Sequence, residues 1–288
     1  SAGTGSGGYA QGDTYTNIQD ATGGSGNDTF VASSVANNFD GGAGINTVSY
    51  ESSTSGVTVN LSTQMVAGVA GNSGSGSYAT GDTYANIQNV IGSTSSDTFI
   101  AGSAANAFTG NGGSDTVSYA ASGSAVTVIF DWSGDTNGCG GSLAAGTGRG
   151  GDAQGDTYNG ISNVTGSTFG GDEFFAHNTL VGTFDGNGGL HDRVNYTGFS
   201  SNLTINLSDK TVGGLNAGKG IVGKTGQDTY IGIHDATGGS GNDTFIAGSA
   251  ANAFDGGTGS NTVSYAASDA GVILSLIHIS EPTRQEAI

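Results

Sequence analysis

The stretch Gly23-Gly24-Ser25-Gly26-Asn27-Asp28-Thr29-Phe30-Val31, or GGSGNDTFV, decides the fold of this chain, and it returns as GGSGNDTFI at residues 238–246. Both copies fit the pattern G-G-x-G-x-D-x-U-x, where U is a large apolar residue, which is typical of a loop followed by a short strand. Glycines tolerate positive φ and can turn carbonyl oxygens toward an ion. The aspartate adds anionic oxygens, and Ca²⁺ binds about six to eight oxygen ligands. The pattern therefore predicts calcium loops.

A second loop must stack on each of these, because one nonapeptide cannot supply all the ligands of a calcium ion. GGAGIN begins at Gly41, which is 18 residues after Gly23, and GGTGSN begins at Gly256, which is 18 residues after Gly238. Eighteen residues are two nonapeptides, so each pair of loops is separated by one full turn of a coil with two strands per turn.

Four modules follow one another along the chain. Each is marked by an Asp-Thr-Tyr tripeptide, and the tripeptides are spaced by 69, 74 and 72 residues, starting at Asp13, Asp82, Asp156 and Asp228. We place the modules at 12–80, 81–154 (with a Gly-rich insert at 131–154), 155–226 and 227–273, and we expect 1–11 to be the end of a truncated upstream module. The Gly/Ser-rich stretches 66–80, 131–154 and 212–226 predict loops or irregular edges.

Apolar residues recur every nine positions within the modules. Module 1 has them at Ala21, Phe30, Phe39, Val48 and Val57, and modules 2 and 4 repeat the series. This period fits neither the alternation of one strand nor a helix. It fits a series of short strands and turns with one large apolar side chain per half-turn. The prediction is an all-β fold, a parallel β-roll or β-solenoid built from nonapeptide half-turns in four modules of about 70 residues.

Module 3 departs from this period. Its residues Val164, Phe174, Phe184 and Val194 are ten positions apart, which indicates one inserted residue in each of three half-turns. We expect β-bulges there and poor geometry for an ion.

The composition predicts a chain that folds only if a further interaction offsets its charge repulsion and the conformational entropy that its glycines lose. Acidic residues outnumber basic ones by 24 to 6, so the net charge is −18, and 56 of the 288 residues are Gly. Such a chain repels itself and attracts cations, and its glycines lose much conformational entropy on folding. Bound calcium can offset this cost, and so can a stacked column of the 12 Phe and 10 Tyr residues. Both can act together.

Several functional classes are disfavoured. Six basic residues leave no electrostatic footprint for nucleic acid, and no apolar run approaches the length of a membrane span. The H-E-x-x-H and G-x-S-x-G motifs are missing from the sequence, so we predict that the chain is not an enzyme. His177, His191 and His234 stand singly, unlike zinc ligands, and the single Cys139 cannot form an intrachain disulfide.

The last residues, 274–288, read LSLIHISEPTRQEAI and contain Pro282, the only proline of the chain. They resemble the translation of a sequencing adapter. We expect them to be a non-native tail, and the fold predicted above excludes them.

Residues 12–273 resemble the RTX, or haemolysin-type, calcium-binding repeat family of exported bacterial proteins. The motifs that carry the resemblance are Gly81-Asp82-Thr83-Tyr84, Ile87-Gln88-Asn89-Val90, Gly92-Ser93, Asp97-Thr98-Phe99, Ala105-Asn106-Ala107-Phe108 and Asp115-Thr116-Val117-Ser118-Tyr119. The resemblance implies a parallel β-roll, calcium between loops stacked on one side, and a secreted or cell-surface location. It also implies that type I secretion machinery exports the intact protein.

The resemblance implies a ligand set as well. The first and third loop carbonyls and the Asp carboxylate of one loop face the second and fourth carbonyls and the Asp of the next. These positions are Gly23, Ser25 and Asp28 against Gly42, Gly44 and Asn46 in module 1, and Gly238, Ser240 and Asp243 against Gly257, Gly259 and Asn261 in module 4.

The departures from the family pattern are informative. Asn46 and Asn261 stand where the family has Asp, so each of these predicted sites has one negative charge fewer. Module 2 keeps both carboxylates, Asp97 and Asp115, in loops with fewer glycines. On the opposite side of the coil, glycine-poor loops carry Asn at the Asp position, and we predict that these loops stack without metal: Asn37, Asn106 and Asn252.

Three functional hypotheses follow. The first is a calcium-binding structural segment of a large exported bacterial protein, of adhesin or surface type, which folds where calcium is abundant. The second is the C-terminal calcium-binding part of a secreted protease, lipase or polysaccharide epimerase. The third is a metal-free β-helix that binds surface glycans.

Overall fold

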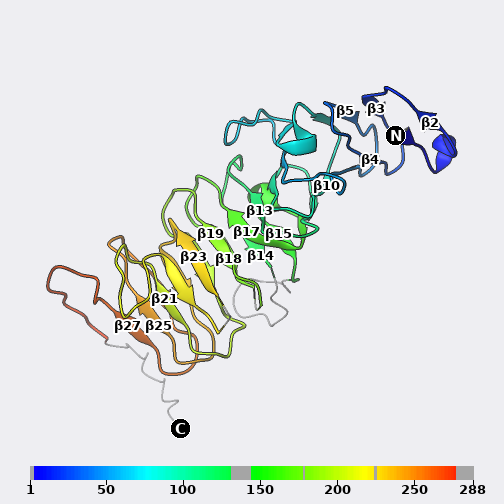
Figure 1. Ribbon diagram of the computed structural model, residues 1–288. Coiled ribbons are helices and arrows are strands. Elements are labelled where there is room, and N and C mark those ends of the chain that lie inside the picture. Colours follow the sequence, from blue (N-terminus) through cyan, green and yellow to red (C-terminus); the bar gives the residue numbers. More distant parts are fainter. Residues whose placement is uncertain (1–2, 131–143, 178, 224–225, 277–288) are drawn as a thin grey trace, which may run out of the picture.

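The computed structural model describes residues 3–130, 144–177, 179–223 and 226–276. Over these ranges the chain winds back and forth between two long β-sheets and advances from one end of the molecule to the other (Figure 1). The only helices in the described ranges are three single 3-10 turns, Gly8–Ala10, Ser77–Ala79 and Gly151–Ala153. The predicted all-β solenoid is confirmed. Cys139 and the tail from 277 onward lie outside the described residues, and 274–276 are exposed and outside any strand.

The first sheet has 14 strands and the second has 11. The parallel strands of the 14-stranded sheet are β3 (Asp20–Thr22), β5 (Asn38–Asp40), β7 (Thr58–Asn60), β9 (Thr83–Ala85), β11 (Thr98–Ile100), β13 (Asp115–Ser118), β17 (Ile161–Thr165), β19 (Thr183–Asp185), β21 (Thr204–Asn206), β23 (Gln227–Ile231), β25 (Thr244–Ile246) and β27 (Thr262–Ser264). Those of the 11-stranded sheet are β4 (Thr29–Val31), β6 (Thr47–Ser49), β10 (Asn89–Ile91), β12 (Ala107–Thr109), β14 (Thr127–Ile129), β16 (Thr157–Asn159), β18 (Glu173–Phe175), β20 (Arg193–Asn195), β24 (Asp235–Thr237) and β26 (Phe254–Asp255).

Most strands are three residues long and turn only their middle side chain inward, because side chains alternate between the two faces of a strand. Phe30, Val48, Val90 and Phe108 occupy equivalent positions on neighbouring strands and form one column of the core. Aromatic rings also meet across the two sheets, as at Phe99 and Phe108 with ring centres 5.6 Å apart. The predicted aromatic column is thus present as packed pairs, with Phe30–Phe39, Phe174–Phe184 and Phe245–Phe254 as further examples.

Three antiparallel strands interrupt this winding: β8 (Ser73–Ser75), β15 (Thr147–Arg149) and β22 (Lys219–Ile221). β8 lies between β7 and β9, so the chain remains in the 14-stranded sheet for three strands before it crosses again. β15 does the same in the 11-stranded sheet, and β22 again in the 14-stranded sheet. At the N-terminal end, β1 (Gly3–Thr4) pairs antiparallel with β2 (Thr14–Tyr15).

The prediction of loops or irregular edges in the Gly/Ser-rich stretches misses these three strands, although turns and other irregular structure make up most of the described remainder of each stretch. The inserted strands have glycine in the middle, where apolar periodicity gives no signal. At Gly74 a Cβ would overlap the Tyr84 hydroxyl group, and Gly148 and Gly220 face Tyr158 and Tyr230 in the same way. Glycine is needed at these positions because the tyrosine of the next strand fills the space of a side chain.

Two details of the predicted periodicity need correction. The middle residue of β7 is Val59, paired with Phe99, although Val57 is also buried. In module 3 the strands β18 and β20 pair without a register shift, so the extra residues lie in the turns rather than in bulges. One bulge does occur, where β13 shifts register against β17 next to Asp115.

A cluster of two tyrosines and an aspartate, largely buried, accompanies each inserted strand, with one tyrosine before the strand in the sequence and the other two residues after it. The Tyr119 hydroxyl donates a hydrogen bond to Asp156 at 2.6 Å and also contacts the Tyr158 hydroxyl. The Asp156 carboxylate accepts the backbone N–H of Asn106 as well. The same cluster occurs as Tyr50, Asp82 and Tyr84, and as Tyr196, Asp228 and Tyr230. These clusters tie the end of one module to the start of the next.

Candidate calcium sites

The predicted loops of each module share one edge of the solenoid, but successive modules use opposite edges. Loops 23–28 and 41–46 lead from the 14-stranded sheet into the 11-stranded sheet, whereas loops 92–97 and 110–115 lead the other way. The expectation that all loops stack on one side is therefore wrong. Each inserted antiparallel strand keeps the chain in one sheet and so reverses the order of crossing.

The paired loops of module 1 stack closely. Gly42 and Gly44 have φ angles of 70° and 94°, a region that favours glycine. A Cβ on these residues would overlap the carbonyl oxygens of Gly24 and Gly26, respectively. The backbone N–H of Ala43 donates to the Gly24 carbonyl at 3.0 Å. These two glycines therefore allow one loop to lie directly on the other.

The side chains that end the two loops of module 1 are tied to the loops by hydrogen bonds. Asp28 accepts the N–H of Gly24 through Oδ2 at 2.7 Å, and its own N–H donates to Asn46 Oδ1 at 2.9 Å. Module 4 repeats this arrangement, with Asp243 bonded to the N–H of Gly239 and to Asn261 Oδ1. Within the described ranges, the eight loop carbonyls of the predicted ligand set accept no hydrogen bond: Gly23, Ser25, Gly42, Gly44, Gly238, Ser240, Gly257 and Gly259.

Module 2 keeps positive φ at two equivalent positions of its second loop. Asn111 and Gly113, at the positions of Gly42 and Gly44, have φ angles of 68° and 90°. Asparagine tolerates this left-handed conformation better than most residues, so Asn111 can hold a positive φ like that of Gly42. The residue between them differs, because Gly112 has a φ of 124° whereas Ala43 has no positive φ. Asp97 accepts backbone N–H groups at both carboxylate oxygens, from Val57 and from Ser93, each at 2.7 Å.

Module 3 contains a pair of carboxylates that the sequence prediction missed. Asp172 accepts the N–H groups of Val126 and Ser167, as Asp97 does in module 2. The N–H of Asp172 donates to Asp192 Oδ1 at 3.0 Å, as that of Asp97 donates to Asp115. Each loop has one more residue than its counterpart, which agrees with the ten-residue apolar spacing. That spacing, followed from Val164, was the signal that would have located both aspartates.

Burial dominates the electrostatics of these pairs. Burial is the largest of the effects that bring the pKa of both Asp115 and Asp192 to about 6. The nearby charge of Asp97 also raises the pKa of Asp115, and that of Asp235 raises the pKa of Asp192. Backbone hydrogen bonds act in the opposite direction on both. The pKa of Asp172 is raised to about 6, mainly by burial and partly by Asp192. Moreover, Asp115 Oδ2 and Asp192 Oδ2 are buried and have no hydrogen-bond partner among the described residues. Two negative charges held together in this way fit a divalent cation.

The glycine-poor loops use asparagine differently. Asn106 Oδ1 accepts the N–H of Gly102 at 3.0 Å, and its Nδ2 donates to the carbonyl of Gln88 in the preceding turn at 2.8 Å. Asn37 and Asn252 make the equivalent bonds, so each amide is satisfied within the protein.

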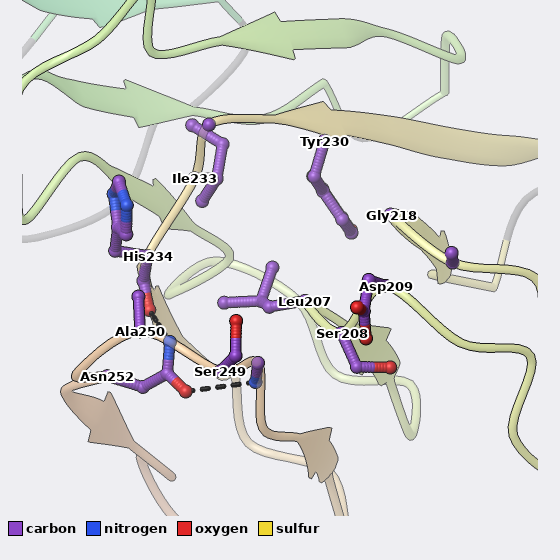
Figure 2. A pocket seen from close by; sticks show the side chains of 13 residues that line it. Leu207, Ser208, Asp209, Gly218, Tyr230, Ile233, His234, Ser249, Ala250 and Asn252 are labelled. Atoms are coloured by element: carbon purple, nitrogen blue, oxygen red, sulfur yellow. Dashed lines mark hydrogen bonds between the residues drawn. The ribbon is translucent and has the colours of Figure 1, made fainter. Parts of the chain in front are cut away.

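Other polar groups form no comparable site. His177 stacks on Phe130 with ring centres 4.4 Å apart, and no group of three or more His, Cys, Asp or Glu residues in the described ranges is arranged to hold a metal. A shallow pocket lies between the loops near His234 and Asn252 (Figure 2), but the Asn252 amide is already bonded to the Gly248 N–H and the His234 carbonyl. No helix in the described ranges is long and apolar enough to cross a membrane.

A comparison with protein families identifies the repeat. The RTX calcium-binding nonapeptide repeat matches in four copies, within residues 21–49, 88–121 and 235–263. The comparison with curated proteins gave no match. The matched ranges contain the stacked loops of modules 1, 2 and 4. Together with the parallel solenoid, they show that the chain carries repeats of the RTX calcium-binding family.

Proposed function

We propose that this chain is a calcium-stabilised structural segment of a large exported bacterial protein, of adhesin or surface type. The observation that carries the proposal is the pairing of buried carboxylates, Asp97 with Asp115 in loops of the matched RTX repeat and Asp172 with Asp192 in loops that are one residue longer. Without a cation each pair places two like charges in a poorly hydrated site, which opposes folding. With calcium bound, the same pairs favour it.

The stabilisation expected from bound calcium is large enough to control folding. Extracellular calcium modules bind with Kd values of about 10⁻⁴–10⁻³ M. At a free calcium concentration tenfold above Kd, each site adds about 1.4 kcal/mol to the free energy of unfolding. Several sites together contribute several kcal/mol, on the scale of the total stability of a domain. The chain would thus stay loosely folded in a calcium-poor cytoplasm and become rigid outside the cell.

The test is thermal and urea unfolding of the full chain, followed by circular dichroism in calcium, in magnesium and in excess chelator. We expect the unfolding midpoint to rise with calcium and much less with magnesium, which demands a smaller octahedral site. An identical β spectrum and midpoint in calcium and chelator would refute the proposal. That outcome would instead support the metal-free β-helix, which could be tested on glycan arrays.

Sequence upstream in the same gene distinguishes the surface protein from the secreted enzyme. A long run of further modules supports an adhesin or surface protein, whose length separates a binding domain from the cell. A protease, lipase or epimerase motif supports the enzyme, in which this segment would assist folding after export.

A further inference from the structure

One side-chain position differs between the modules by a single atom. The second loop of each module ends in Asn or Asp, and its Oδ1 accepts the backbone N–H of the aspartate that ends the first loop. These bonds are 2.9 Å at Asn46, 2.7 Å at Asp115, 3.0 Å at Asp192 and 2.9 Å at Asn261. The four side chains are therefore placed alike. What differs is the remaining atom, which is Nδ2 in asparagine and Oδ2 in aspartate.

In module 1 this atom is a donor with a partner. Asn46 Nδ2 donates to the carbonyl oxygen of Asn86 in the next turn at 3.0 Å and lies 3.4 Å from that of Ala43. Asn86 has a left-handed conformation, with φ 55°, which turns its carbonyl toward Asn46. The contact joins the second loop of module 1 to the start of module 2 without an ion.

In modules 2 and 3 an acceptor faces an acceptor at the same place. Gly160 and Gly232 occupy the position of Asn86 and share its conformation, with φ 71° and 60°. The Gly160 carbonyl and Asp115 Oδ2 both converge on Gly110, where a Cβ would fill the space between them. The Gly232 carbonyl and Asp192 Oδ2 converge on Gly186 in the same way.

When the aspartates are ionised, neither oxygen can satisfy the other, because a carboxylate oxygen and a carbonyl oxygen only accept hydrogen bonds. Asp115 and Asp192 are fully buried, and each Oδ2 lacks a partner in the described ranges. No Lys or Arg within those ranges forms an ion pair with Asp97, Asp115 or Asp172. A bridging water could supply hydrogens but would leave the paired charges uncompensated, whereas a divalent cation supplies both attraction and charge.

We infer that Asp115 with the Gly160 carbonyl, and Asp192 with the Gly232 carbonyl, each hold one calcium ion at a junction between modules, and that the Asn46 amide takes the place of this ion in module 1. The choice of calcium rests on the proposed function. The assignment goes beyond the family match, since residues 160, 192 and 232 lie outside the matched repeats. It also places ions beside loops that are less regular than the two consensus GGSGND loops.

The test compares the full wild-type chain with the double variant Asp115→Asn/Asp192→Asn, using equilibrium dialysis against calcium and thermal unfolding with calcium or chelator. We expect the variant to lose one bound calcium per substituted aspartate. Because the new amides can donate to Gly160 and Gly232, the variant should also unfold at a higher temperature than the wild type in chelator, and its calcium-induced shift should shrink. The reverse variant Asn46→Asp is the matched control, and it should gain a bound calcium and lose stability in chelator.

The outcomes are distinguishable. Equal calcium stoichiometry in the wild type and the double variant would overturn this assignment and leave the proposed function standing, with water in the gap. A wild type that binds no calcium would overturn both. Equal destabilisation of the double variant in calcium and in chelator would also refute the assignment, because it would mean that the carboxylates serve only the local hydrogen bonds.

Discussion

Removing a single hydroxyl group tests how the modules are joined. Tyr119 is fully buried, and its hydroxyl donates to the Asp156 carboxylate at 2.6 Å. Burial raises the pKa of Asp156 to about 7, and the hydrogen bond from Tyr119 acts in the opposite direction. In Tyr119→Phe the carboxylate keeps its bond from the Asn106 N–H but loses its only hydroxyl donor among the described contacts.

The expected cost depends on the charge of Asp156. A hydrogen bond to a charged group contributes about 1.5–3 kcal/mol and one to a neutral group about 1 kcal/mol. At about pH 8, above the folded pKa, Tyr119→Phe should therefore lower the free energy of unfolding by roughly 2–3 kcal/mol, and at about pH 5 by roughly 1 kcal/mol. The substitution raises the Asp156 pKa further. The free energy of unfolding of the variant should therefore keep falling to a higher pH than that of the wild type.

Urea unfolding of Tyr119→Phe, Asp156→Asn and the double variant, at fixed saturating calcium, measures the coupling. We expect a coupling free energy of about 1–2 kcal/mol at alkaline pH, which decreases as the pH is lowered. Tyr265→Phe is the control, because Tyr265 occupies the same position in the last turn and has no such partner in the described ranges. If Tyr119→Phe costs the same with Asn at 156, the hydroxyl acts through packing and the reasoning fails.

Three further predictions use the same unfolding assays. The pKa of Asp156 is raised in the folded state, so between about pH 4 and 7 the folded protein binds a proton that the unfolded chain has lost. The free energy of unfolding of the wild type should therefore fall as the pH rises over this range. Asp156→Asn should remove a component on the order of 4 kcal/mol from this fall. Gly44→Ala should cost about 2 kcal/mol or more, because Gly44 has φ 94° and its Cβ would overlap the Gly26 carbonyl, whereas Gly26→Ala, which faces open space, should be nearly neutral. Phe99→Ala should cost about 3–5 kcal/mol, as Phe99 is fully buried, while Phe169→Ala, at a half-exposed position, should cost less than about 1 kcal/mol.

The fold could be predicted because its determinants are local. A nine-residue apolar period places one inward residue on each short strand, and the GGSGND motif supplies the turn between strands. What escaped the prediction depends on contacts between distant residues. Gly74 is in the middle of a strand only because the Tyr84 hydroxyl occupies the space beside it. The Tyr119–Asp156 bond joins residues 37 positions apart, and sequence alone marked the second only as a module boundary.

The sequence located the loops of modules 1, 2 and 4 but did not indicate which of the four loop pairs contain two buried carboxylates. The loops that end at Asp28 and Asp243 match every glycine of the consensus pattern. The second loops stacked on them, however, end in the amides Asn46 and Asn261. Asn111 shows that asparagine can hold a positive φ at a position where the consensus loop has glycine. Asp172 and Asp192 were missed because each loop contains one extra residue. Matching glycines therefore indicates loop conformation, while buried carboxylates are the groups whose charge a bound cation would offset.

The alternation of edges has an electrostatic consequence for a chain of net charge −18. The loop pairs of modules 1 and 3 lie on the same edge, and β5 and β17 are six strand positions apart in the 14-stranded sheet. With strands about 4.8 Å apart, this separation is roughly 29 Å, several times the screening length of about 8 Å at physiological ionic strength. Between them on that edge lies the Asn106 loop, which is neutral and internally bonded. Without the inserted strands, successive loop pairs would share one edge and lie closer together. The inserted strands thus let each module carry its own loop pair, with one or two aspartates, while repulsion between pairs stays screened, and the array can lengthen by whole modules without a growing electrostatic cost.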